Sequence, residues 1–212
     1  MRCYLVRHGQ TVWNGENRLQ GHSDLELNAV GLEQARRVGA FFAARRASGE
    51  ALTALYSSSL KRSVQTAQAI VESTGLTLRQ DSALAESHLG TWEGLTPEEI
   101  DAKFDGAYQQ WYRHPSQVTI PGAEPLETFK RRVQDAFERI RATENGREGS
   151  VVIVTHGGVI ASLLADWLKA DYEDILRRVV LENAGVSAVD CDTMPPYIRW
   201  VNATQHLTDA PI

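Results

Sequence analysis

The segment SVVIVT at Ser150–Thr155 decides the fold class. An uninterrupted run of apolar, mostly β-branched residues predicts a strand that is buried on both faces, as in the middle of a largely parallel sheet. His156, Gly157 and Gly158 follow this strand, and the apolar sequence after them predicts a helix. A buried strand that leads into a helix is typical of the α/β fold class.

The same alternation of strands and helices extends along the chain. Further strand-like runs lie at Cys3–Arg7, Thr53–Ser57, Leu76–Arg79, Val186–Cys191 and Tyr197–Val201. Helical patterns follow Asn28, follow Ser59 and cover residues 127–142. The first helix carries apolar residues at helical spacing, namely Leu32, Ala35, Val38, Phe42 and Ala43. The turn TMPPY between the last two strands predicts an antiparallel pair at one edge of the sheet.

Composition narrows the function classes. The 212 residues, of which 42% are hydrophobic and 23% charged, fit one globular domain. A net charge of -5 predicts no general surface for nucleic acid. The first apolar stretch is interrupted at Arg7 and His8, well short of a signal peptide or the about 20 residues of a membrane span. We therefore expect a cytoplasmic protein, with Cys3 and Cys191 as buried free thiols.

Two of the predicted strands end in a histidine. The sequence LVRHGQTVWN at residues 5–14 places Arg7 and His8 at the end of the first strand, and His156 ends the strand at Ser150–Thr155. In an open α/β sheet the ligand crevice lies outside the carboxyl ends of the strands. We therefore expect His8 and His156 to face one another across this crevice.

The residues around these histidines are suited to an anion. Gly157 and Gly158 open a helix, and the N–H groups and positive dipole end of a helix start favour negative charge. Arg62 lies one turn into the helix after a third strand, so that it and Arg7 provide two guanidinium groups. The sequence predicts a phosphoryl group held by these arginines, by His156 and by the Asn14 amide.

Four segments in this order, LVRHGQTVWN, YSSSLKRSVQTA, ESHLGTWEG and VTHGG, resemble the histidine phosphatase superfamily, in its phosphoglycerate-mutase-like branch. The resemblance runs from Cys3 to about Ala188. It implies a three-layer sandwich in which helices flank a mostly parallel central sheet, within a single domain at 1–212. Residues 97–125 include a stretch rich in Trp, Tyr, Gly and Pro, and we interpret them as an insertion that covers the substrate.

The resemblance also implies a role for individual residues. His8 is the phosphorylated nucleophile and Glu86 the proton donor. The implied phosphate pocket consists of Arg7, Asn14, Arg62 and His156, with Gln20, Gly21 and Gly157 beside the phosphate. A neutral imidazole is the form that attacks phosphorus, and nearby arginines disfavour protonation of His8. Glu93 competes with Glu86 for the role of the acid.

Other polar residues have less certain roles in the sequence. We assign His88 to the substrate site, while His22 borders either the substrate or the solvent. Arg113 and His114 in the insertion, with Lys103 beside them, could contact a second group of the substrate or form a solvated face. His206 follows the last strand and has no identifiable partner.

Together these features predict a metal-independent phosphomonoesterase that acts on a small phosphorylated metabolite through a phosphohistidine and needs no cofactor. Two alternatives stay open: a cofactor-dependent phosphoglycerate mutase and a phosphate-binding interaction module. A metal hydrolase is disfavoured because the sequence contains neither HxH nor HExxH. We expect neither nucleic acid nor membrane partners. Homodimers are common in the family, but the sequence itself indicates no interface.

Overall fold

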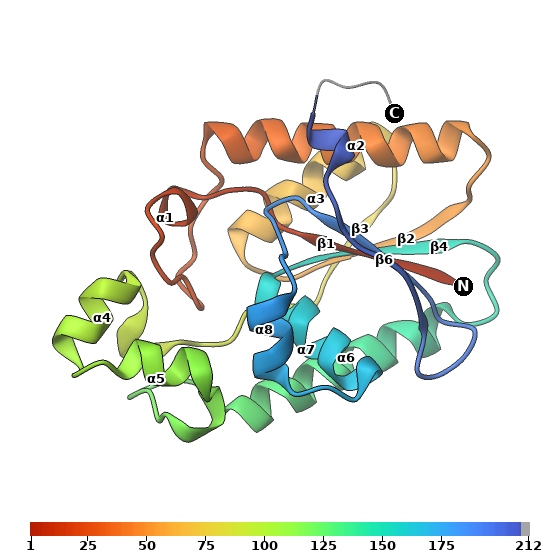
Figure 1. The fold of residues 1–212 in the computed structure, drawn as a ribbon. Helices are drawn as coiled ribbons and strands as arrows, with labels where there is room; N and C mark the ends of the chain where they lie inside the picture. The colour runs from red at the N-terminus through yellow and green to blue at the C-terminus, as the bar shows by residue number, and fades with distance from the viewer. Residues whose placement is uncertain (209–212) are drawn as a thin grey trace.

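A six-stranded sheet forms the centre of the computed structural model, which describes residues 1–208 (Figure 1). The strands are β1 (Arg2–Arg7), β2 (Leu52–Ser57), β3 (Leu78–Gln80), β4 (Ser150–Thr155), β5 (Val186–Asp190) and β6 (Tyr197–Ala203). Their order is β3-β2-β4-β1-β5-β6; the first four are parallel, whereas β5 is antiparallel to both β1 and β6. The mostly parallel sheet is confirmed, with β4 fully buried and the last two strands antiparallel at one edge.

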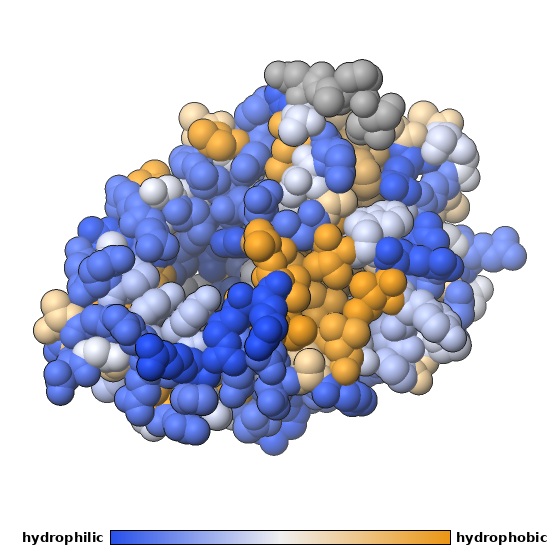
Figure 2. Space-filling view, in the orientation of Figure 1, coloured by the Kyte–Doolittle hydropathy of each residue, from blue (hydrophilic) through white to orange (hydrophobic). Residues whose placement is uncertain are grey.

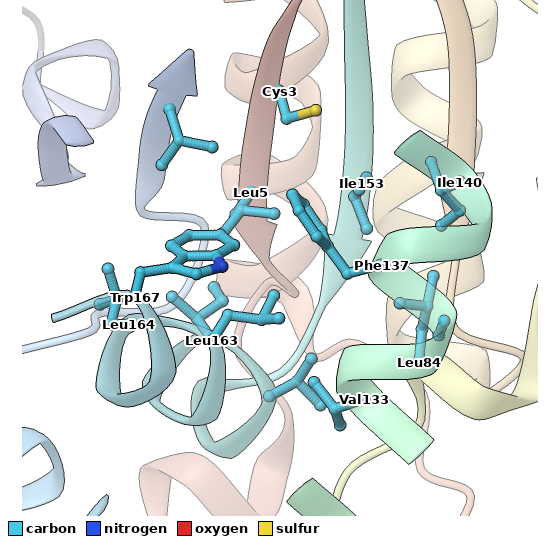
Figure 3. Packing of buried hydrophobic residues seen from close by; sticks show 14 of the residues in the cluster. Cys3, Leu5, Leu84, Val133, Phe137, Ile140, Ile153, Leu163, Leu164 and Trp167 are labelled. Carbon is cyan, nitrogen blue, oxygen red and sulfur yellow. The ribbon is translucent and has the colours of Figure 1, made fainter. Parts of the chain in front are cut away.

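Helices cover both faces of the sheet, which confirms the three-layer architecture (Figure 1). On one face lie α2 (Ala29–Ala47) and α3 (Lys61–Thr74), and on the other α6 (Leu126–Glu144), α7 (Gly157–Leu168) and α8 (Tyr172–Arg178). Alternate residues of β1 point into the two cores, so that Tyr4 packs toward α2 and Leu5 toward α6 and α7. Figure 3 shows the second of these cores, where Leu5 and Phe137 lie close together.

One prediction for α2 is wrong. Leu32 was expected on the buried face, but it is 54% exposed. The buried residues of this helix are Gly31, Ala35, Val38, Gly39 and Phe42. The buried face of α2 is rotated away from Leu32 because the start of the helix is fixed to the loop after β1. Asn28 accepts from the Gly31 N–H at 2.8 Å and donates to the Gln10 side chain at 2.9 Å.

Two short helices lie beyond the sheet, at the end where β1, β2 and β4 have their carboxyl ends (Figure 1). They are α4 (Pro97–Lys103) and α5 (Ala107–Arg113), and we call residues 97–125 the cover. Thr96 and Glu99 form the expected capping box at the start of α4. Ile100 and Ile120 of the cover form a separate small core with Trp92.

The remaining elements are single turns. They are α1 (Val12–Gly15), η1 (Ser82–Leu84), η2 (Gly90–Trp92), η3 (Pro115–Gln117) and η4 (Gln205–Leu207). None of the helices within residues 1–208 is long and apolar enough to cross a membrane.

Candidate active site

The structure brings His8 and His156 together at the carboxyl ends of β1 and β4. Their ring centroids are 5.2 Å apart, and both side chains are buried. The two strand ends are joined directly, since the His8 N–H donates to the Thr155 carbonyl at 2.9 Å. This is the crevice position at which an open α/β sheet binds its ligand.

The hydrogen bonding of His8 determines which ring nitrogen can react. Nδ1 lies 2.7 Å from the carbonyl oxygen of Gly9, so it carries the proton and donates it to that oxygen. The lone pair is then on Nε2. Burial lowers the pKa of His8 well below 6.5, and the charges of Arg62 and Arg7 lower it further. These contacts favour a neutral imidazole whose free lone pair is on Nε2.

His156 is hydrogen-bonded by Ser58, a residue that the sequence did not single out. Its Nε2 lies 2.8 Å from Ser58 Oγ and 3.3 Å from Ser63 Oγ. Its Nδ1 is buried and has no hydrogen-bond partner within the part of the chain that the structure describes. Burial lowers the pKa of His156, with further contributions from Arg62, His8 and Arg7. Because Ser58 directly follows β2, strand-end position was the signal that could have identified it.

The two arginines are fixed by backbone carbonyls. Arg62 donates to the carbonyls of Gly21 and Ser23, each at 2.8 Å, and Arg7 donates to the carbonyl of Leu181. Burial lowers the pKa of Arg62 to about 10, so it still carries its charge at neutral pH. In both arginines Nε is buried and unpartnered among the described residues. A ligand with several anionic oxygens would satisfy these donors.

Glu86 occupies the start of α7, where the sequence analysis expected backbone N–H groups to hold the phosphate. Its carboxylate accepts from the Gly158 N–H at 3.0 Å and from the Ser87 N–H at 2.9 Å. A Cβ at position 158 would lie 2.3 Å from Glu86 Oε1, so a larger residue there would displace this carboxylate. Gly157, at the first position of α7, lies beside Arg7 Nε.

Arg132 connects the Glu86 loop to the cover and was also missed by the sequence analysis. It donates to the carbonyls of Ala83, Ala85 and Glu86 at 3.0, 2.7 and 2.7 Å. The same guanidinium binds both carboxylate oxygens of Glu124, at 2.7 and 2.8 Å. One side chain of α6 therefore holds both the proposed acid and the edge of the cover.

These residues open into a cavity of about 650 Å³. One end is lined by Arg7, His8, Arg62 and Glu86, with Asn14, Gln20 and Gly21 beside them. The other end is lined by the cover, by the start of α6, by Leu176 of α8 and by Arg18, His88 and Leu89. The volume is in the range of small-molecule sites and exceeds what a phosphate group alone requires. We call the two parts the phosphate end and the outer chamber.

Comparison with known proteins agrees with this geometry. The model of the histidine phosphatase superfamily (branch 1) matches residues 3–204. The chain belongs to this superfamily. Superfamily relatives include both phosphatases and proteins named as mutases.

Three similar proteins illustrate this range. "Phosphoglycerate mutase-like protein 4" of Arabidopsis thaliana is 41% identical over 161 residues, covering 75% of this chain and 67% of that protein. "2-carboxy-D-arabinitol-1-phosphatase" of Triticum aestivum is 34% identical over 195 residues, or 92% of this chain but only 38% of the wheat protein. The solved structure of a mycobacterial glucosyl-3-phosphoglycerate phosphatase has a TM-score of 0.82 at 31% identity, covering 96% of this chain and 99% of the other.

The smaller polar contacts of this histidine phosphatase site lie near α1. Asn14 Oδ1 accepts from the Thr11 N–H at 3.1 Å and from Asn183 at 3.2 Å. Gln20 Oε1 accepts from the Thr11 hydroxyl at 2.9 Å. Asn183 also donates to the His8 carbonyl at 3.1 Å, and no pattern in the sequence pointed to it. Gly21 adopts a positive φ of 50°, which turns its carbonyl toward Arg62.

Glu93 stabilises the backbone around His22 and Leu89 and does not line the cavity beside His8. It accepts from the backbone N–H groups of His22 and Leu89 at 2.9 and 3.1 Å and from the Ser23 hydroxyl at 2.7 Å. His88 lines the cavity and packs edge-on against His22 at 5.0 Å. His22 donates through Nε2 to the Glu86 carbonyl at 2.7 Å.

Four other candidates are not brought to the cavity. Arg113, His114 and Lys103 are exposed on the cover and do not line the cavity. His206 is buried on the far side of the sheet, where its Nε2 donates to the Ala184 carbonyl at 3.0 Å and its ring packs on Phe41. Burial lowers the pKa of His206.

Proposed function

We propose that this protein hydrolyses phosphomonoesters of small metabolites through a phosphohistidine at His8. One observation carries the proposal: a neutral imidazole lies beside three buried nitrogen atoms that have no hydrogen-bond partner among the described residues. These atoms are Arg7 Nε, Arg62 Nε and His156 Nδ1, and His156 Nδ1 is a donor in the tautomer whose Nε2 accepts from the Ser58 hydroxyl. They supply the contacts that the charged oxygens of a transferring phosphoryl group need.

In the first step His8 Nε2 attacks the phosphorus atom, and the phosphorus–oxygen bond to the alcohol breaks. The electron pair of that bond moves to the departing oxygen, and the Glu86 carboxyl gives it a proton. Arg7, Arg62 and His156 hold the three remaining oxygens. The products of this step are the free alcohol and N-phosphohistidine.

In the second step the Glu86 carboxylate accepts a proton from a water molecule, whose oxygen attacks the phosphorus atom. The phosphorus–nitrogen bond breaks, and its electron pair returns to His8 Nε2. Inorganic phosphate leaves and the starting protonation states are restored. The sum is one ester and one water converted to one alcohol and one phosphate.

Water, rather than a second hydroxyl group, is the proposed acceptor. A mutase must hold a phosphorylated acid while it reorients and must keep water away from the phosphohistidine, which calls for cations beyond the phosphate site. Arg113 and His114, which could have met that need, lie outside the cavity. The mutase alternative is favoured by the name of the Arabidopsis relative.

The test compares two rates. Phosphate release from a panel of phosphomonoesters is measured beside the exchange of 2- and 3-phosphoglycerate, with and without added bisphosphoglycerate. We expect release to be much faster. Bisphosphoglycerate-dependent exchange that outruns hydrolysis of every ester would support the mutase, and tight phosphate binding without turnover would support a binding module.

The positive field of Arg7 and Arg62 supports a reaction without a metal ion. Exhaustive chelation is therefore expected to leave the rate unchanged, and a loss restored by one divalent ion would contradict this part of the proposal. A cytoplasmic location and a homodimeric state remain predictions.

A further inference from the structure

Apolar side chains form much of the wall of the outer chamber. The apolar side chains that line it come from the cover, the segment before it, the start of α6 and α8: Leu89, Trp111, Val118, Ile120, Leu126 and Leu176. Figure 2 shows that the outer surface around α4 and α5 is mostly hydrophilic. The apolar side chains of the cover are therefore turned toward the cavity and toward the small core behind it.

Trp111 provides an aromatic wall in a fixed position. Its ring lies 6.0 Å from that of Trp92 and 5.8 Å from that of Tyr108, and Trp92 is fully buried. Two aromatic neighbours thus support the indole while it also lines the cavity. A supported aromatic face is suited to an apolar or aromatic part of a ligand.

The outer chamber contains no uncommitted cation among the described residues. Arg18 lines the chamber, and it donates to Glu99 at 2.6 and 3.1 Å and to Glu16 at 3.0 Å. His88 also lines the chamber, with Nε2 3.8 Å from the Glu93 carboxylate. A carboxylate of a substrate would find each of these groups already facing an acidic partner.

The remaining charged side chains of the chamber are acidic. Glu124 lines it and is paired with Arg132 through both oxygens. Glu127 lines its mouth and accepts from Lys130 at 3.0 Å. The electrostatic potential in this part of the cavity is therefore neutral to negative, whereas the two buried arginines make it positive at the phosphate end.

We propose that the outer chamber selects phosphomonoesters whose alcohol is uncharged and apolar, with an extended alkyl or aromatic body, and rejects alcohols that carry a second anionic group. The inference rests on the proposed phosphatase function and adds the substrate class to it. A carboxylate entering the chamber loses its water without gaining a cation. An alkyl chain gains about fourfold in binding for each methylene that the walls bury.

A matched pair of esters tests this selection. Hexyl phosphate and 6-(phosphonooxy)hexanoate have leaving alkoxides of the same kind and chains of similar length, and they differ in a terminal carboxylate. We expect kcat/KM for hexyl phosphate to exceed that for the carboxylated ester by at least about tenfold. From ethyl to butyl to hexyl phosphate, kcat/KM should rise by about fourfold per methylene until the chamber is filled.

A variant of the chamber wall and its control test whether the outer chamber determines this substrate preference. Leu176→Lys adds a cation to the wall and should shift the ratio of the two rates toward the carboxylated ester by at least about tenfold. Its control is Val180→Lys, since Val180 is 68% exposed and does not line the cavity, so the same charge there should leave the ratio unchanged.

Trp111→Ala should lower kcat/KM for hexyl phosphate relative to ethyl phosphate by about tenfold, because it removes the aromatic wall. Tyr112→Ala is its matched control. Tyr112 belongs to the same helix, is 44% exposed and does not line the cavity, so the hexyl-to-ethyl ratio should not change.

The possible failures are distinguishable. If the two matched esters react equally while His8 becomes phosphorylated, the substrate class is wrong and the proposed function stands. A preference for the carboxylated ester in the unaltered protein also overturns the inference. If neither ester is hydrolysed and no phosphohistidine forms with any ester, the proposed function fails and the inference falls with it.

Discussion

The phosphate end and the outer chamber are built from different parts of the chain. The phosphate end is polar, and its side chains come from the end of β1, the first turn of α3 and the segments that carry Asn14, Gln20 and Glu86. The outer chamber is mostly apolar, and its walls come from the cover, α6 and α8. The side chains proposed to contact the phosphoryl group therefore differ from those proposed to contact the alcohol, and variants at the two ends should behave differently.

Arg62→Met is expected to have the largest effect because it removes a buried donor from the phosphoryl group itself. Loss of one such donor lowers kcat/KM by about 10³-fold, and the loss should be equal for ethyl and hexyl phosphate. Lys61→Met is the control, since Lys61 is the exposed neighbour of Arg62 and its nearest acidic partner, Glu26, is 3.7 Å away. A loss confined to the longer ester would show that the two ends of the cavity are not independent.

Glu86→Gln should slow esters with poor leaving groups more than esters with good ones. Alkyl esters need a proton on the departing oxygen and should slow by about 10²- to 10³-fold, whereas p-nitrophenyl phosphate should slow far less. Steady-state kinetics on both esters measure the difference. Equal losses would indicate a structural role for Glu86, and a normal Glu86→Gln beside an inactive Glu93→Gln would exchange the two assignments.

The pH dependence of stability provides a smaller effect, which tests the buried state of His8 at the phosphate end. The pKa of His8 is below 6.5 in the folded protein because of burial, Arg62 and Arg7. Below pH 6.5 the unfolded chain therefore binds a proton that the folded protein does not, and the free energy of unfolding falls as the pH falls. Each such histidine contributes up to about 1.4 kcal/mol per pH unit.

Urea unfolding between about pH 7.5 and pH 5.5 measures this slope. His8→Asn should make the slope shallower. His114→Asn, which changes an exposed histidine on the cover, should leave it unchanged. A slope that is unaffected by His8→Asn would mean that His8 is not held neutral by its surroundings.

The sequence could predict the phosphate end better than the outer chamber. Arg7, His8 and His156 lie at strand ends, and the rule that parallel strands meet at one edge brings them together without knowledge of packing. Ser58 follows another strand end and could have been found in the same way. Asn183 could not, because its contact with the His8 carbonyl depends on how the segment before β5 returns to the site.

Helix faces and the cover were harder to predict because long-range packing decides them. Leu32 fits the helical pattern, yet contact between α2 and the loop after β1 turns it to the solvent. In the cover, the sequence left open whether Arg113 and His114 contact the substrate or form a solvated face; the structure exposes them and places Trp111 at the cavity instead. Charge in a sequence does not show which side of a short helix packs inward.

The most direct test of the account is the chemical state of His8 during turnover. The protein is mixed with hexyl phosphate, quenched within the first turnovers under denaturing conditions, and the phosphorylated residue is mapped by mass spectrometry. The account predicts an alkali-stable, acid-labile phosphoryl group on His8, and no labelling in His8→Ala. A phosphoryl group on a serine, or near-normal turnover by His8→Ala, would contradict it.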